Sequence, residues 1–223
     1  MAGSPSSTPN LRIKYTHVPT NQTVEFQAFL ETFSDAYSSE WSSEKVFGRM
    51  DPIAQYKGTG RVLTFSFTVP SFDSQEALQN HLKISKLMQF MYPTYEGNTE
   101  VDNYVITAPP LMLVKFNNLI QNEAPVSVGA DGLLGYIPDV KYEPDMNSNI
   151  FNLQGEKYNP AGADDATNKV VNPLLAFQSF KINTTLNVLH THRLGWGTTK
   201  KTDGTISISP ARPLFPYGYD ILK

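Results

Sequence analysis

Two histidines in the segment VLHTHRLGWG are the residues whose type and spacing come closest to a metal site. His190 and His192 lie two positions apart, so both side chains would point to the same side of an extended strand. Zinc sites usually take three or four ligands, and the sequence has no HExxH motif; the remaining histidines, His17 and His81, lie far away in sequence. An Asp or Glu from elsewhere would have to complete the site. The alternative is that this segment ends a strand, with Trp196 packed beneath a turn bracketed by glycines.

Motifs for covalent or phosphate chemistry are missing. The chain has no cysteine, which excludes thiolate nucleophiles and thiolate zinc sites, and it has no GxSxG motif. The glycines of GTGR (58–61) and VGADGLLG (128–135) lack the lysine and the strand–loop–helix context of a phosphate loop, so they predict hairpin turns. No sequence pattern singles out the pair of acids that glycosidic cleavage needs, and a pair such as Glu40 with Glu44 could be proposed only by arbitrary choice. We expect a protein that is not an enzyme, with no catalytic, cofactor-binding or metal-binding residues.

The segment GRMDPI (48–53) combines a glycine, a cation, an acid and a proline within one short loop. Asp51 precedes a proline and is therefore biased away from helix. Arg49 lies within reach of Asp51 or of an acid on a neighbouring element. A bidentate arginine–carboxylate pair would fix the loop against another element or another subunit. We interpret this loop as an anchor.

The composition fits a protein that is covered by neighbours. Of the 223 residues, 40% are hydrophobic, which is enough for a core, while only 17% are charged, less than in most soluble domains. The net charge of −3 argues against a basic surface for nucleic acid. No secretory signal is expected, and no apolar run is long enough to span a membrane.

The elements that would position these residues are mostly strands. The residues of RVLTFSFTV (61–69) alternate between apolar and small polar side chains, which is typical of a half-buried strand. The segments 111–120, 132–145 and 177–190 predict further strands, the second bent at Pro138. A helix over 74–92 is expected from a capping-box-like start at Asp73 and Glu76, an apolar stripe at helical spacing, and a stop at Pro93.

The remaining segments predict an insertion and two arms. Residues 147–173 are rich in Asn, Gly, Asp and Ala and predict a long insertion loop. Residues 1–20 and 198–223 are rich in Pro, Ser, Thr and Gly, and they predict arms on either side of one domain at 21–197. The expected fold class is α+β, mostly β: an antiparallel sandwich or barrel flanked by one long helix, with extended terminal arms.

An ordered series of sequence blocks resembles a family of small virion proteins of contractile-tailed bacteriophages. The blocks are VFGRMDPIAQYKGTGRVLTFSFTV with the helix and YPTYE turn that follow, APPLMLVKFNNLI, GLLGYIPDVKYEPDM, and INTTLNVLHTHRLGW. They cover roughly residues 40–197 and occur in the family's order. The insertion at 147–173 is longer than this pattern has, and the proline-rich C-terminal segment is not part of it.

The resemblance implies a structural protein of the tail baseplate or tube, of the tube-initiator or hub-adaptor type, with a tail-tube-like fold. It would form a six-fold ring with copies of itself, contact tube, hub and wedge proteins, and let genomic DNA pass without binding it. Assembly would occur in the host cytoplasm, and the mature location would be the virion. The neutral-polar strand faces, Thr64, Ser66 and Thr68 together with Asn183, Thr185 and Asn187, would line the channel or meet a neighbouring ring.

Two alternatives remain open at this point. One is a peripheral wedge or sheath adaptor of the same baseplate. The other belongs to a different class: a carbohydrate-binding or cell-wall-degrading tail protein, suggested by the scattered Tyr and Trp residues. Aromatic residues at strand positions are more often part of a core or a subunit interface.

Overall fold

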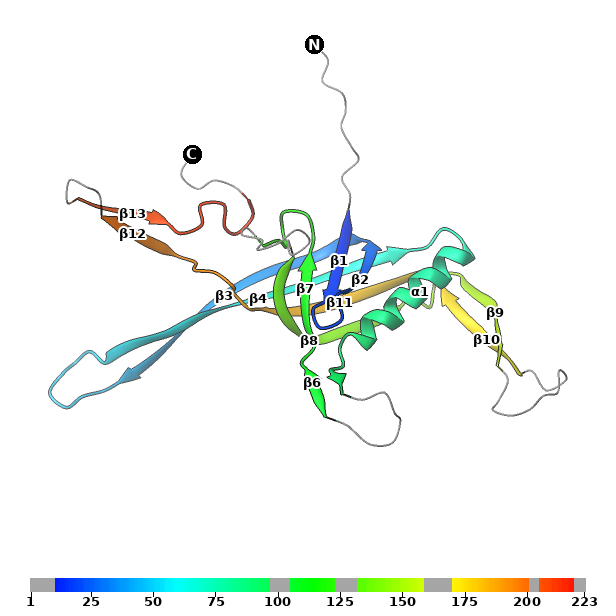
Figure 1. Cartoon of the computed structure of the whole chain (residues 1–223), viewed down its shortest axis with the longest axis horizontal. Coiled ribbons are helices and arrows are strands. Elements are labelled where there is room, and N and C mark those ends of the chain that lie inside the picture. Colours follow the sequence, from blue (N-terminus) through cyan, green and yellow to red (C-terminus); the bar gives the residue numbers. More distant parts are fainter. Residues whose placement is uncertain (1–10, 97–104, 123–131, 159–169, 201–204, 219–223) are drawn as a thin grey trace, which may run out of the picture.

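The computed structural model describes residues 11–96, 105–122, 132–158, 170–200 and 205–218. In this part of the chain, strands dominate and a single helix accompanies them (Figure 1). The largest sheet is antiparallel and has seven strands in the order β2-β1-β7-β8-β11-β4-β3. The expectation of a mostly-β fold with one helix is confirmed. The sheet is open in the described residues, since β2 and β3 form its two edges.

The seven strands are β1 (Arg12–His17), β2 (Gln22–Gln27), β3 (Phe29–Glu44), β4 (Ile53–Pro70), β7 (Leu111–Lys115), β8 (Leu133–Pro144) and β11 (Ser179–Val188). Three short two-stranded sheets surround them: β5 (Thr94–Tyr95) with β6 (Ile106–Ala108), β9 (Ile150–Tyr158) with β10 (Val170–Phe177), and β12 (Trp196–Lys200) with β13 (Ile206–Pro210).

The alternating strands form the core as predicted. Leu63, Phe65, Phe67 and Val69 of β4 are buried, as are the five alternate residues of β11 that begin at Phe180. Side chains from opposite ends of the strand order also meet: the ring of Phe26 on β2 lies 6.1 Å from Phe67 and 6.5 Å from Phe180. Tyr15 on β1 hydrogen-bonds Thr184 on β11 at 3.1 Å. The sheet is therefore strongly curled, with the core on its inner face.

Helix α1 (Ser74–Gln89) packs against this inner face. Its first turn is capped because the Glu76 amide donates to Asp73 Oδ1 at 2.7 Å, and Glu76 Oε2 accepts from the Phe72 amide at 2.7 Å. Ile84 and Leu87 enter the core. The predicted helix over 74–92 is confirmed, with turn residues after Gln89.

The segments expected to be arms or loops contain strands. Within 1–20, residues 12–17 form β1, whose Ile13 and Tyr15 are fully buried; the range 1–10 lies outside the described residues. Within 147–173, β9 and part of β10 form a hairpin beside α1, and 159–169 lie outside the description. Within 198–223, β13 pairs with β12, which itself begins at Trp196. Backbone pairing overrides the polar composition in each case.

Candidate assembly surfaces

The hairpin of β3 and β4 is the most prominent surface feature. The two strands have 16 and 18 residues, and they pair continuously from Phe29↔Thr68 to Glu44↔Ile53 apart from two bulges. Only the inner part of the hairpin lies on the core, and the outer part projects from the molecule (Figure 1). GTGR (58–61) lies within β4, directly after a bulge at Lys57, so the predicted hairpin turn there is wrong.

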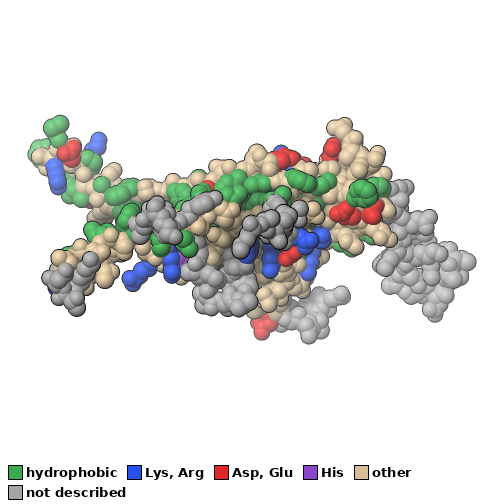
Figure 2. All heavy atoms as spheres, turned by 90° about the horizontal axis from the view of Figure 1, so that it is seen from above, with side chains coloured by type: hydrophobic (Ala, Val, Ile, Leu, Met, Phe, Trp, Pro, Cys, Tyr) green, Lys and Arg blue, Asp and Glu red, His purple; other side chains and the backbone are tan. Residues whose placement is uncertain are grey.

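Large apolar side chains are exposed along the outer part of the hairpin. Phe47 and Met50 at its tip are fully exposed, with relative exposures of 106% and 101%. Others along it are Trp41, Val46, Ile53 and Tyr56. At the end of the molecule that carries this tip, Figure 2 shows hydrophobic side chains beside acidic and basic ones. Exposed apolar residues that gather far from the core are typical of a contact surface.

GRMDPI forms the tip of this hairpin. Gly48 has φ +83°, a conformation that favours glycine, and the Arg49 amide donates to the Val46 carbonyl at 3.2 Å to close the turn. Arg49 and Asp51 are both exposed, and the structure shows no ion pair for either within its described part. An anchoring role for these two charges therefore requires another molecule.

A bidentate arginine–carboxylate pair does exist, at the base of the hairpin. Arg61 on β4 donates from Nε to Asp35 Oδ1 at 3.0 Å and from Nη2 to Oδ2 at 2.8 Å. Both side chains are buried, with relative exposures of 2% and 3%. Arg61 is in phase with the buried Leu63, and Asp35 pairs with Leu63 across the strands, so the ion pair lies on the inner face. Sequence reasoning missed it because the two residues meet only through strand pairing.

The C-terminal segment covers this ion pair. Tyr217 donates from its hydroxyl to Asp35 Oδ2 at 2.9 Å, and Phe215 places its ring 5.3 Å from the Arg61 guanidinium. Tyr37 lies on the same guanidinium at 5.3 Å, and its ring meets that of Phe215 at 6.0 Å. Burial, followed by the bond to Asp35, raises the pKa of Tyr217, so its hydroxyl remains a donor. We name Arg61, Asp35, Tyr37, Phe215 and Tyr217 the clasp.

A pocket of about 370 Å³ lies beside the clasp. Its lining combines three aromatic rings with two histidines and small or aliphatic residues: Tyr37, Tyr56, Thr59, His190, His192, Leu194, Gly195 and Phe215. Burial lowers the pKa of both histidines, and the Arg61 charge lowers that of His190 further, so both imidazoles are neutral at pH 7. This aromatic pocket is formed by the hairpin, by the segment after β11 and by the C-terminal segment.

The two histidines do not form the strand pair that the sequence suggested. β11 ends at Val188, and His190 and His192 follow in an irregular segment. No group of three or more His, Cys, Asp or Glu side chains that could hold a metal is found among the residues described. The neighbouring Trp196 is exposed at the start of β12.

The outer face of the sheet is polar where β4 and β11 pair. Register places Ser66 beside Asn183 and Thr64 beside Thr185, so the two predicted polar strand faces form one surface. Charged residues interrupt it, which corrects the expectation of a wholly neutral face. Four of them form two ion pairs, Lys181 with Glu31 at 2.6 Å and Lys141 with Glu143 at 2.5 Å.

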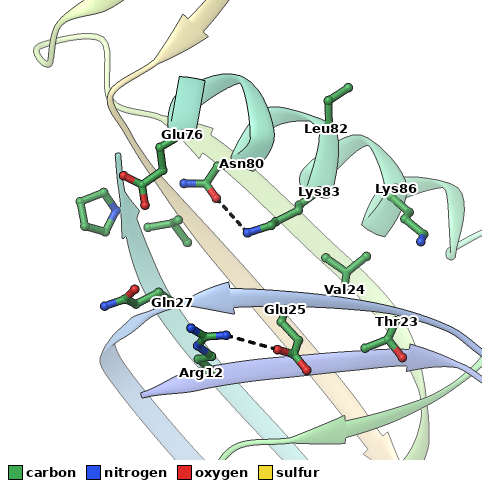
Figure 3. Close-up of a pocket in the computed structure, with 12 residues that line it drawn as sticks. Arg12, Thr23, Val24, Glu25, Gln27, Glu76, Asn80, Leu82, Lys83 and Lys86 are labelled. Carbon is green, nitrogen blue, oxygen red and sulfur yellow. Dashed lines mark hydrogen bonds and ion pairs between the residues drawn. The ribbon is translucent and has the colours of Figure 1, made fainter. Parts of the chain in front are cut away.

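A second hollow, of about 670 Å³, lies between α1 and the edge strand β2 (Figure 3). Asn80 and Lys83 extend from the helix on one side, and Arg12 and Glu25 from β1 and β2 on the other. Lys83 donates to Asn80 at 3.4 Å, and Arg12 pairs with Glu25 at 3.8 Å. Its polar groups are thus largely engaged with one another, and no catalytic arrangement results.

None of the helices in the described residues is long and apolar enough to cross a membrane. A scan against models of known protein families finds no match to this chain, and a search of curated proteins finds none either.

Proposed function

We propose that this chain is a non-enzymatic structural subunit of a contractile bacteriophage tail, forming a ring in the hub or tube of the baseplate. The observation that carries the proposal is the β3–β4 hairpin, whose outer half presents Phe47 and Met50 to solvent without a core of its own. The outer half of such a hairpin gives up few contacts with its own domain when it inserts into a neighbouring subunit, and the insertion buries its exposed apolar side chains.

The sequence blocks that resemble the phage family support this proposal through their placement. The blocks supply β4, β7, β8 and β11, which are consecutive in the sheet order β7-β8-β11-β4. The helix named in the same series is α1, directly after β4. The residues that carry the resemblance therefore form neighbouring strands of one sheet.

The proposed tail-tube-like fold agrees with the curled sheet and its single helix. Its two edges, β2 and β3, would pair with neighbouring subunits to complete a barrel, which would also protect edges that otherwise invite aggregation. The outer polar face would then line the passage. Two of its lysines, Lys141 and Lys181, are paired with glutamates, which leaves fewer cations available for phosphate contacts, so DNA would pass without being held.

Electron microscopy of intact tails tests the proposal. A tag on residue 223 should decorate the axial tube or hub in a six-fold arrangement. Decoration of the peripheral wedges or the sheath instead would overturn the ring assignment and favour an adaptor. Incubation with purified peptidoglycan and host polysaccharide should show neither binding nor cleavage; reproducible binding would favour the carbohydrate-binding class.

A further inference from the structure

The tip of the β3–β4 hairpin and the aromatic pocket are complementary in chemistry. Phe47 and Met50 expose all of their apolar surface. The pocket, at about 370 Å³, has room for an aromatic side chain and is lined mostly by rings and aliphatic groups. Both histidines that line it have pKa values lowered by burial, so at pH 7 it presents no cationic imidazole to an apolar guest.

The tip cannot fill the pocket of its own chain. Strand pairing continues to Glu44↔Ile53, and the pocket lies nearer the base of the hairpin, beside Tyr37 and Tyr56. From Tyr37 to Glu44, where β3 ends, the extended strand covers about 23 Å, and the tip lies beyond it. Folding the tip back would break the ladder. Only a second molecule can bring a tip to this pocket.

We propose that Phe47 at the hairpin tip of one copy inserts into the aromatic pocket of a second copy of this chain. The contact joins unlike surfaces, so each copy has one free tip and one free pocket, and repetition gives a ring or a filament. Met50 covers the mouth of the pocket, and Arg49 and Asp51 lie at its rim. The inference deepens the proposed function and rests on it for the biological setting.

Cysteine cross-linking tests the contact directly because the native chain has no cysteine. The protein with Met50→Cys, which keeps Phe47, is mixed at high concentration with the protein carrying Thr59→Cys, a pocket residue. The matched control partner carries Ser85→Cys on the exposed side of α1. We expect at least about tenfold more disulfide-linked dimer with the pocket variant than with the control. Equal yields with both partners would overturn the proposal.

Complementation gives a second readout that does not depend on oxidation. Phe47→Ser removes the tip anchor, and Thr59→Trp fills the pocket; both positions are exposed, so circular dichroism should show the native fold in each. Each variant alone should be monomeric in sedimentation, while their mixture should form 1:1 dimers and nothing larger. A mixture that stays monomeric while the unaltered chain associates would refute the insertion.

The outcomes separate the contact from the wider function. Dimers formed by complementation, together with a location outside the axial tube and hub, would retain the contact and reject the ring in the tail. A six-fold ring in tails whose subunits give no Met50–Thr59 cross-link would support the proposed function and reject the contact.

Discussion

Replacing Asp35 with alanine should destabilise the protein more than any exposed charge change. The substitution leaves the Arg61 guanidinium buried without a carboxylate, held only by the rings of Tyr37 and Phe215 at 5.3 Å. Removing one partner of a buried ion pair costs about 3–5 kcal/mol. It also leaves the Tyr217 hydroxyl without its acceptor. For a chain of this length we expect the melting temperature to fall by roughly 6–20 °C.

Urea unfolding followed by fluorescence and circular dichroism gives the free energy directly. The matched control is Glu40→Ala, which breaks the ion pair with Lys57 across the same two strands. There both partners are exposed and the separation is 3.3 Å, so its loss should cost at most about 1 kcal/mol. The double replacement Asp35→Leu with Arg61→Met should recover much of the lost stability, because no unpaired charge is then buried.

The reasoning fails if Asp35→Ala costs no more than Glu40→Ala. That outcome would mean that water reaches the Arg61 guanidinium in the folded protein and that the C-terminal segment does not cover it. A double variant that is as unstable as Asp35→Ala would instead show that packing, and not the isolated charge, sets the cost.

Three further predictions concern other parts of the molecule. Arg49→Ala and Asp51→Ala should each reduce assembly into tails while leaving the unfolding free energy within about 0.5 kcal/mol, because both residues are exposed; normal assembly of both would make GRMDPI a simple turn. Gly135→Ala should cost about 2 kcal/mol or more in urea unfolding, since its Cβ would lie 2.4 Å from a backbone oxygen of β11, whereas Gly58→Ala, with no atom within 4 Å, should cost far less. Burial lowers the pKa of His17 below its ordinary 6.5, so the unfolded state binds more protons and stability is lost as the pH falls below about 6.5. Replacing it with glutamine should reduce the slope between pH 7.5 and 5.5, and His190 and His192, whose pKa values burial also lowers, should keep the rest; an unchanged slope would contradict the assignment.

The core strands and the helix could be predicted because each carries its own pattern. In β4 and β11 the apolar and polar residues alternate over the whole inner part, and one face of each is buried as that pattern requires. For α1 the cap and the apolar stripe agree. Strand β1 was missed although Ile13 and Tyr15 alternate, because its composition resembles that of a disordered arm and its burial depends on β2 and β7.

The candidate surfaces depend on pairing that no local pattern reveals. Arg61 begins the alternating run in phase with Leu63, and an arginine at a core-facing position was a signal that it needs a buried partner. The identity of that partner follows only from the register of β3 on β4. GRMDPI was predicted to be a loop, and it lies between β3 and β4. Its position at the tip of a projecting hairpin could not be predicted, because it depends on the length of β3, whose outer half has few apolar residues.

The bond between Tyr217 and Asp35 sets an order of events during synthesis. The two residues are 182 positions apart, so at a typical ribosomal rate Tyr217 is synthesised roughly 9–36 s after Asp35. During that time the base of the hairpin lacks its cover, and the aromatic pocket lacks the wall that Phe215 provides. Nascent chains on neighbouring ribosomes would therefore expose tips but no completed pockets, which would delay self-association until each subunit has been made and folded.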